Sequence, residues 1–494
     1  MAVRKPFNFI LAAALVLSLS GCYRLPDGPP EAPSVSQSPT TSQPEVQADQ
    51  SLTLAWYPQN TLNPLFSRDR VNQTLAPLLY QSLFELDTRF VPQPLLCREA
   101  SVSDSGTVWT LQLKDGVTFS DGTPLNAAAA ARSLEWARSS TRWGARLADV
   151  VSISADAGLT LTLTLSRPNR ALPALLDIPI VSDSGDRPLG SGPYVLDGTA
   201  SQLIPRDRLH STLSPIALQP ITQHTDLTQG FGPEGKLSLA DADVNATDHP
   251  GFAHLCADFP YDTTALIYLG FHAARPTVRS AEARQAISQA LDRGSLVRSA
   301  FGGHALATAL PIHPASPLYD ESLARQFTDT GSPAELLEQA GLTGKSVTLL
   351  VNRENSARLA AAQQIARQLE KAGMTVKVSA QDWNGYLNAL NNGLFDLYLA
   401  ETTLTADFDL SPLVGSGGSL NYTRWTGNEV NRLLSALRSA TEEERPQVAR
   451  DLCGELADRC PIAPLCFKRG SLLVRPQLDL TLTPTRANPF FGWF

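Results

Sequence analysis

Hydrophobic and polar residues alternate with a period of two in several short segments of this chain. In 159–166 (LTLTLTLS) leucine and threonine alternate, which is typical of a strand with one buried face. Segment 108–114 alternates in the same way and ends at Asp115-Gly116, a tight-turn signal. Further strands are predicted at 51–57, 346–352, 375–381 and 394–400.

A second group of segments has helical spacing or strong helix formers. In 71–87 leucines recur three to four residues apart, and 127–138 begins with a run of alanines. Helices are also predicted at 281–300 and 357–372. Strands and helices alternate between 346 and 400, which predicts a sheet covered by helices and therefore an α/β fold.

The first 22 residues have the pattern of an export signal. Arg4 and Lys5 precede an apolar run over 9–19, about half the length that a transmembrane helix needs. The run leads into Leu19-Ser20-Gly21-Cys22, which resembles the bacterial lipobox, in which the cysteine is acylated and the chain is cut just before it. The resemblance implies a signal peptide over 1–21 and lipidation of Cys22; the alternative is an ordinary export signal with a coincidental cysteine.

The segment after Cys22 is unlike the rest of the chain. Six of the 36 prolines lie in 25–49, among serine, threonine, glutamine and alanine. Such a segment buries too little apolar surface to offset its ordering entropy, so we expect a disordered linker over 22–50. We therefore expect a lipid anchor, followed by a semi-rigid tether and then a globular body.

Composition and charge exclude several classes of protein. Hydrophobic residues make up 43% of the 494 residues and charged residues 18%, so most of the chain should fold. The net charge of −8 argues against nucleic-acid binding, which needs a basic surface. The sequence contains no HExxH, GxSxG, GxGxxG or P-loop motif, so we expect neither an enzyme nor a metal or cofactor site.

If Cys22 is lipidated, five of the six cysteines remain, and an odd number leaves at least one thiol unpaired. Cys453 and Cys460 are seven residues apart, too far on one helix for a disulfide bond. Cys460 with Cys466, or a pair that includes Cys97 or Cys256, is more feasible. The alternative is buried free thiols.

Six strings decide the wider resemblance: TLNPLF (61–66), LLYQSLFELD (78–87), WTLQLKDGVTFSDGTPLNA (109–127), GSGPYVL (190–196), VRSAEARQAISQALDRGSLV (278–297) and NYTRWTGNEVNRLL (421–434). In this order they resemble the family 5 extracellular solute-binding proteins of ABC transporters, the oligopeptide- and dipeptide-binding group. The resemblance covers 52–494.

The resemblance implies a two-lobed α/β fold, the periplasmic-binding-protein fold of type II, cluster C, with an extra subdomain in the first lobe. We expect the first lobe with its subdomain over 51–265, the second lobe over 266–467 and a C-terminal return to the first lobe over 468–494. Two strands would cross between the lobes near 266–271 and 464–468.

The resemblance also implies the function. We expect a monomeric lipoprotein on the outer face of the cytoplasmic membrane, extracellular or periplasmic, that captures peptides between its lobes and delivers them to an ABC permease. It would have no cofactor and would bind no nucleic acid. The alternatives are the same fold with a nickel chelate, haem, an opine or an oligosaccharide as ligand, or a signalling receptor.

Candidate ligand contacts follow from the same resemblance. Asp407 stands in the Ala-Asp-aromatic context that binds a peptide ammonium in relatives, with Asp409 as its rival; the alternative role is a helix N-cap or a surface aspartate. Trp383, with Tyr386 beside it, matches a segment that lines the side-chain pocket. The remaining candidates, expected to contact the ligand backbone, are Asn421, Tyr422 and Trp425.

Overall fold

The computed structural model describes residues 52–207, 213–245, 251–328, 331–476, 478 and 482–493. The predicted signal peptide, the predicted linker and the predicted lipidation site Cys22 lie outside the described residues.

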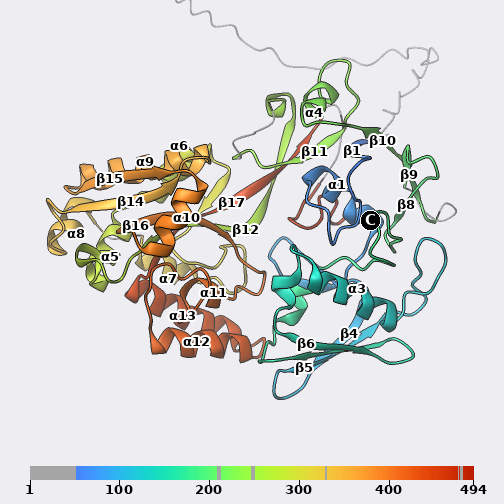
Figure 1. Ribbon diagram of the computed structural model, residues 1–494, viewed down its shortest axis with the longest axis horizontal. Helices are drawn as coiled ribbons and strands as arrows, with labels where there is room; N and C mark the ends of the chain where they lie inside the picture. Colours follow the sequence, from blue (N-terminus) through green and yellow to red (C-terminus); the bar gives the residue numbers. More distant parts are fainter. Residues whose placement is uncertain are drawn as a thin grey trace, which may run out of the picture. The chain divides into compact units, whose positions relative to one another are not determined.

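One large sheet runs through the described part of the chain, in the order β15-β14-β16-β12-β17-β11-β1-β10-β9-β8, with β13 also paired to β17. Its two longest strands, β12 and β17, pair antiparallel in the middle of this order (Figure 1). The predicted crossings at 266–271 and 464–468 fall within these two strands. The strands are β1 (Thr53–Trp56), β8 (Tyr194–Leu196), β9 (Gln202–Pro205), β10 (Ile216–Pro220), β11 (Leu239–Ala242), β12 (Ala257–Phe271), β13 (Ala305–Ala307), β14 (Ser346–Asn352), β15 (Thr375–Gln381), β16 (Leu397–Thr403) and β17 (Ile462–Val474).

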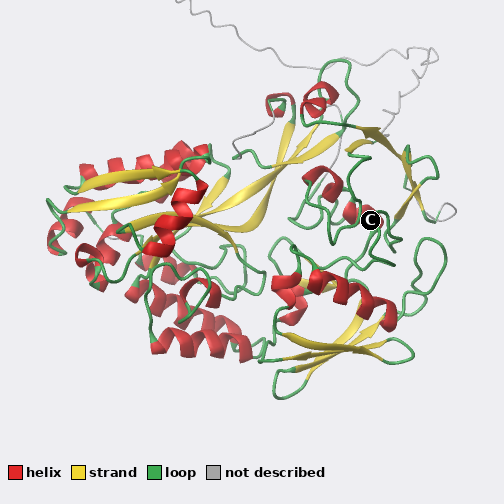
Figure 2. Cartoon of the chain, in the orientation of Figure 1, coloured by secondary structure: helices red, strands yellow, loops and turns green. Residues whose placement is uncertain are grey.

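The second lobe covers both faces of the β14–β16 part of this sheet with helices (Figure 2). Val347, Leu349 and Val351 of β14 pack in one core with helix α9, whereas Leu350 packs in another core with helix α10. Because both faces are buried, the strand is apolar at nearly every position. The helices of this lobe are α5 (Ala281–Gln289), α6 (Arg293–Ala300), α7 (Glu321–Gln326), α8 (Pro333–Gln339), α9 (Ser356–Lys371), α10 (Trp383–Asn392), α11 (Ser411–Val414), α12 (Asn428–Ser439) and α13 (Arg445–Arg459).

The first lobe has its own core, built around a four-stranded antiparallel sheet in the order β4-β5-β7-β6 and the helix α3. In β7 the leucines are buried and the threonines are partly exposed, as the alternation predicts. The C-terminal residues Leu482 and Phe490 pack in the same core. The elements are α1 (Arg70–Thr74), α2 (Ala76–Leu79), β2 (Phe84–Leu86), β3 (Pro92–Pro94), β4 (Cys97–Val102), β5 (Val108–Leu113), α3 (Ala127–Ser139), the 3-10 helix η1 (Gly144–Leu147), β6 (Val150–Ala155), β7 (Thr160–Leu165) and the 3-10 helix η2 (Leu172–Leu175).

The smallest core groups buried residues of β11 and β17 with residues near helix α4 (Thr225–Gly230), including Phe231 and Phe252, whose rings stack. The described chain also contains the short 3-10 helices η3 (Ala253–Leu255) and η4 (Pro276–Val278).

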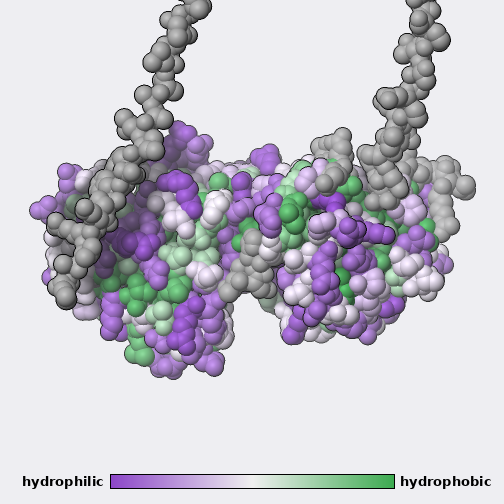
Figure 3. Space-filling view, turned by 90° about the horizontal axis from the view of Figure 1, so that it is seen from above, coloured by the Kyte–Doolittle hydropathy of each residue, from purple (hydrophilic) through white to green (hydrophobic). Residues whose placement is uncertain are grey.

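On the face in Figure 3, hydrophobic residues form small groups among hydrophilic ones.

Three predicted elements are wrong in extent. The predicted helix 71–87 is two short helices and strand β2, because Pro77 has no N–H to donate to Gln73. The predicted helix 281–300 is interrupted after Gln289, and the Asp292 side chain accepts a hydrogen bond from Ser295 N at 2.8 Å to start α6. The strand predicted at 394–400 begins three residues later, after the left-handed Gly393 that ends α10.

Candidate ligand-binding cleft

A cavity of about 580 Å³ lies between the cores of the two lobes. We call the core of the first lobe the first core and the core that contains α10 the second core. Trp143 and Leu482 of the first core and Leu404 of the second core contribute to the cavity wall. A depression of about 500 Å³ beside it shares Arg142, Tyr261 and three other residues with the cavity, so the two form one cleft. The lining residues come from 86–88 and Phe90, from the segments 142–146, 258–264, 403–406 and 482–487, and from Asp177 and Arg469.

One end of the cavity is built from three arginines, Arg142, Arg146 and Arg486, which we call the arginine end. Trp143 holds the first two: its ring lies 5.0 Å from the Arg142 guanidinium carbon and 4.7 Å from that of Arg146. The ring is itself fixed, because Trp143 is buried in the first core and its indole N–H donates to the Pro64 carbonyl at 3.1 Å. Arg142 and Trp143 lie in the turn between the end of α3 at Ser139 and the start of η1 at Gly144.

Arg486 comes to the arginine end from the C-terminal segment of the chain. It lies in a turn closed by the backbone hydrogen bond from Thr485 N to Asn488 O at 2.9 Å. Asn488 Nδ2 donates to Glu85 Oε1 at 2.6 Å, which ties the turn to β2. The Arg486 guanidinium donates to Thr264 Oγ1 of β12 at 2.7 Å. Residues more than 300 positions apart therefore meet at the arginine end.

Charge at this end is only partly neutralised. Asp177 forms an ion pair with Arg146, whereas neither Arg142 nor Arg486 has such a pair among the described residues. The surrounding protein and the Arg146 charge lower the pKa of Arg142 to about 10, against the opposing pull of Asp177. Burial, Arg146 and Arg142 lower the pKa of Arg486 to about 10, again against Asp177. Both remain cations at neutral pH.

The other cations of the cleft are mostly paired. Each pair is formed across a short distance: Arg70–Asp241 at 3.1 Å, Lys468–Asp243 at 2.7 Å and Arg469–Asp262 at 2.7 Å. Arg68, on the depression, has no ion pair among the described residues and donates only to Thr141 Oγ1 at 3.5 Å.

The cavity wall also carries two acids of β12. Asp262 pairs with Arg469, and Asp258 lies 3.4 Å from His304 Nδ1. Among the described residues, neither acid forms an ion pair with Arg142 or Arg486. The cavity therefore offers both cationic and acidic groups to one ligand.

Asp407 and Asp409 lie next to the cavity but face the contact between the lobes. Residues 403–406 line the cavity, and the Asp407 carboxylate, 5% exposed, accepts from Asn169 Nδ2 of the first lobe at 3.2 Å and from Thr405 Oγ1 at 2.5 Å. Asp409 accepts from Ser411 N at 2.9 Å at the start of α11 and from Arg438 Nη1 at 2.6 Å.

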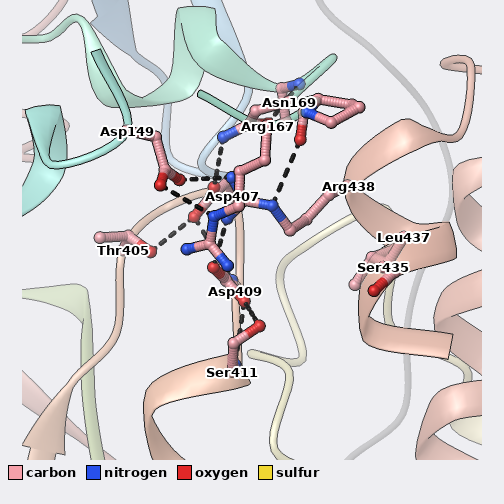
Figure 4. Close-up of polar contacts among 12 residues, drawn as sticks. Asp149, Arg167, Asn169, Thr405, Asp407, Asp409, Ser411, Ser435, Leu437 and Arg438 are labelled. Atoms are coloured by element: carbon pink, nitrogen blue, oxygen red, sulfur yellow. Dashed lines mark hydrogen bonds and ion pairs between the residues drawn. The ribbon is translucent and has the colours of Figure 1, made fainter. Parts of the chain in front are cut away.

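Arg438 joins the two lobes (Figure 4). Its guanidinium, on α12 of the second lobe, donates to Asp409 and to Asp149 Oδ2 of the first lobe at 2.5 Å. Arg167 Nε donates to the same Asp149 carboxylate at 2.8 Å. We call these groups the interlobe network: Asp149, Arg167, Asn169, Asp407, Asp409 and Arg438.

Trp383 and Tyr386 stand together at the start of α10, with ring centroids 6.0 Å apart. Trp383 is 48% exposed, whereas Tyr386 is 4% exposed, packs in the second core and donates its hydroxyl to the Leu399 carbonyl at 2.9 Å. Neither lines the cavity.

The loop 421–425 is held by its own hydrogen bonds. Asn421 Nδ2 donates to the carbonyls of Gly415 at 3.0 Å and Trp425 at 2.9 Å. Tyr422 packs edge to face on Tyr398, with ring centroids 6.2 Å apart, and Trp425 packs against the same core. These three residues do not line the cavity either.

The arginine end is the feature that sequence reasoning missed. Arg486 is distant in sequence from Arg142 and Arg146, so no local pattern joins them. A usable signal was the string RWGAR (142–146), in which two arginines flank a tryptophan at helical spacing.

The described residues show three further features. Cys97, Cys256, Cys453, Cys460 and Cys466 are all free thiols. Histidine, cysteine, aspartate and glutamate side chains do not gather there in a group of three or more that could hold a metal ion. None of the helices in these ranges is long and apolar enough to cross a membrane.

Comparison with known proteins identifies the family. The family model of the bacterial extracellular solute-binding proteins, family 5 (middle), matches residues 91–204 and 216–421. The glutathione-binding protein GsiB of Salmonella typhi is 24% identical over 470 residues, which cover 83% of this chain and 87% of that protein.

Solved structures share the fold. The ABC transporter substrate-binding protein CtaP of Listeria monocytogenes matches with a TM-score of 0.70 at 20% identity, over 89% of this chain and 97% of that one. The unliganded open form of the periplasmic murein tripeptide-binding protein MppA matches with a TM-score of 0.72 at 19% identity, over 86% and 93%. The predicted two-lobed α/β fold is confirmed.

Proposed function

Because this chain belongs to the bacterial extracellular solute-binding proteins of family 5, which serve ABC transporters, we propose that it captures a peptide between its lobes and delivers it to an ABC permease. The observation that carries the peptide assignment is that arginines without an ion pair and carboxylates line the same cavity. A peptide has a carboxylate that suits the arginine end and an ammonium that suits the acids of β12.

Cavity size supports a short peptide. A volume of about 580 Å³ lies in the range typical of sites for small ligands. The wall also offers apolar area from Leu86, Phe90 and Leu404, which suits side chains of varied sequence. GsiB is a glutathione-binding protein and MppA a murein tripeptide-binding protein, so peptide-like ligands occur among the similar proteins.

Asp407 stays a candidate for the ammonium of the ligand. Its carboxylate already accepts from Asn169 and Thr405, so it would have to exchange one of these partners for the ligand. Asp407→Asn should weaken binding of peptides with a free amino group far more than binding of N-acetylated peptides if the contact forms. Equal weakening of both would mean that Asp407 acts through the interlobe network alone.

The remaining predicted contacts stay predictions. Trp383 and Tyr386 on α10, and Asn421, Tyr422 and Trp425 on the loop that follows α11, lie outside the cavity wall. Alanine at the exposed Trp383 is the informative substitution, since the other four side chains also serve core packing or loop hydrogen bonds. An unchanged Kd would remove Trp383 from the ligand contacts.

Anchoring is part of the proposal. A monomer held by a lipid on Cys22 would work on the outer face of the cytoplasmic membrane, and residues 4–22 carry the argument. Cys22→Ser should move the protein from the membrane fraction to the soluble fraction of fractionated cells. Equal membrane retention of both forms would contradict the lipid anchor.

Identification of the bound ligand tests the function itself. Mass spectrometry of small molecules released from the purified, denatured chain should find short peptides, and thermal-shift screening should respond to a peptide library. Release of a metal chelate, a sugar or an opine, with no shift from any peptide, would overturn the assignment. Loss of peptide uptake on deletion of the gene would support delivery to a permease, whereas intact uptake with a lost transcriptional response would favour a receptor.

A further inference from the structure

The cationic side chains that line the cleft differ in how they are neutralised. Arg70, Arg146, Lys468 and Arg469 each have a carboxylate partner. Arg142 and Arg486 face the cavity without an ion pair among the described residues. Both side chains are exposed to solvent here, so water hydrates them in the empty cleft. A ligand that displaces this water and is enclosed between the lobes must supply anionic partners, because an enclosed charge without a partner is unfavourable.

Both guanidiniums are held in position yet keep most of their donors. Arg142 lies over the Trp143 ring and donates from Nη1 to the Ser67 carbonyl at 3.4 Å. Arg486 donates from Nη1 to Thr264 Oγ1 at 2.7 Å. A guanidinium has five N–H donors in a planar fork that suits a carboxylate. Each therefore has enough free donors for one carboxylate of its own.

Charge at the arginine end adds to the same conclusion. Three guanidiniums face one carboxylate, that of Asp177, which leaves two positive charges in excess. The lowered pKa of Arg142 and of Arg486, caused by the surrounding protein and by the neighbouring arginines, agrees with this excess. A single carboxylate would leave one positive charge uncompensated when the lobes enclose the ligand.

We propose that the arginine end binds two carboxylates of one ligand, one at Arg142 and one at Arg486, so that the cleft prefers peptides that end in an acidic residue. The preference rests on the proposed function, peptide capture in this cavity. The C-terminal residue of such a peptide carries the terminal carboxylate and a side-chain carboxylate a few bonds apart. A guanidinium fork also fits a phosphate, so a ligand with one phosphate group is the competing occupant that the experiment includes.

Calorimetry with matched tripeptides tests the preference on the unaltered full chain. The peptides are alanyl-alanyl-glutamate, its isosteric amide alanyl-alanyl-glutamine, and alanyl-alanyl-phosphoserinamide, which carries a phosphate in place of both carboxylates. The glutamate peptide should bind at least about tenfold more tightly than the glutamine peptide, the ratio expected for one hydrogen-bonded charge pair. The phosphate peptide should bind more weakly than the glutamate peptide.

Substitutions locate the effect. In Arg486→Gln and in Arg142→Gln, the ratio of the Kd of the glutamine peptide to that of the glutamate peptide should fall to about one, because only one guanidinium remains for two carboxylates. Arg89→Gln is the matched control: Arg89 is exposed in the turn beside the cavity but does not line it, so the ratio should stay as in the unaltered chain.

Each outcome has one meaning. Equal binding of the glutamate and glutamine peptides by the unaltered chain overturns the two-carboxylate site and leaves peptide capture standing; this comparison needs no variant to fold. Tightest binding of the phosphate peptide also overturns it. A ratio that falls equally in Arg89→Gln shows a long-range charge effect and overturns the assignment to Arg142 and Arg486. Binding of none of the peptides overturns both the preference and the proposed function.

Discussion

Replacing Arg438 by methionine removes the guanidinium that joins the two lobes and keeps an unbranched side chain in its place. The guanidinium donates to Asp149 at 2.5 Å, to Asp409 at 2.6 Å and to the Pro168 carbonyl at 3.3 Å. Its side chain is only 9% exposed, and those of Asp149 and Asp409 are 25% and 13% exposed. The substitution therefore acts on a largely buried network rather than on a solvated surface pair.

The size of the effect follows from what remains after the substitution. A hydrogen bond to a charged group contributes roughly 1.5–3 kcal/mol, and removing one partner of a buried ion pair costs about 3–5 kcal/mol when the other is left bare. Here neither carboxylate is left bare: Asp149 keeps Arg167, and Asp409 keeps Ser411. Part of the loss is also offset because methionine has no charge to desolvate. We expect Arg438→Met to lower the free energy of unfolding by about 2–3 kcal/mol.

Urea denaturation followed by tryptophan fluorescence measures this difference. Arg432→Met is the matched control: Arg432 lies on the same helix, is 63% exposed and pairs with Glu429 three residues away. Such a solvated pair contributes little to stability, because water and salt screen it. If the two variants lose the same free energy, the interlobe network does not stabilise the protein and the reasoning fails.

Acid should remove the difference between Arg438→Met and the unaltered chain. Burial raises the pKa of Asp149, but the hydrogen bonds and charges of Arg167 and Arg438 outweigh it and hold the pKa below its ordinary value. Such a carboxylate contributes stability that is complete above the unfolded pKa, about 3.9, and is lost as the pH falls through the lower folded pKa. A difference between the two proteins that persisted unchanged at pH 2 would contradict this origin.

Three further predictions concern buried groups elsewhere. His313 is fully buried, and burial lowers its pKa to about 4; Arg469 acts in the same direction and Asp262 opposes it. The folded protein should therefore lose up to about 3 kcal/mol of stability between pH 6.5 and pH 4. His313→Asn, whose amide oxygen can still accept from the backbone N–H of residue 315, should remove most of this pH dependence in urea titrations at both pH values. Gly270→Ala would place a Cβ 2.1 Å from a ring atom of Tyr398 and should lower the thermal midpoint, whereas Gly454→Ala, in helix α13 with no heavy atom within 4 Å, should raise it; the opposite order would contradict the packing. Burial raises the pKa of three cysteines to about 12, so iodoacetamide at pH 8 should label them only in denaturant, as peptide mapping would show: Cys453, Cys460 and Cys466.

Much of the fold could be predicted because its signals are local. The alternation of 159–166 identified β7, and the apolar run 346–352 identified β14 to the residue. The errors occurred where one residue or one contact overrides the pattern. Pro77 interrupts the leucine spacing of 71–87, and Asp292 starts a new helix inside 281–300.

The cleft was harder to predict because it is assembled from distant segments. A single sequence gives no measure of which arginine meets which, and Arg486 reaches Arg142 only because the C-terminal segment returns to the first core. Asp407, predicted to bind the ligand ammonium, is a buried acid next to the cavity, and its partner Asn169 lies 238 positions away. The contact with Asn169 decides which lone pairs of the Asp407 carboxylate are left for a ligand, and no local sequence pattern predicts that contact.

The loop after β16 connects the cavity to the interlobe network. Residues 403–406 line the cavity, and Asp407 and Asp409, directly after them, bind groups of the first lobe and Arg438. A ligand stabilises the arrangement of lobes that it contacts, so free energy contributed by the network to that arrangement is free energy that the ligand need not supply. A network that was too strong would hold the lobes together without ligand, and the proposed permease could not tell the loaded protein from the empty one. Because Asp149 keeps Arg167 within the first lobe and Arg438 keeps Asp409 within the second, the lobes can separate at a cost of a few kcal/mol, within reach of the binding energy of a small ligand.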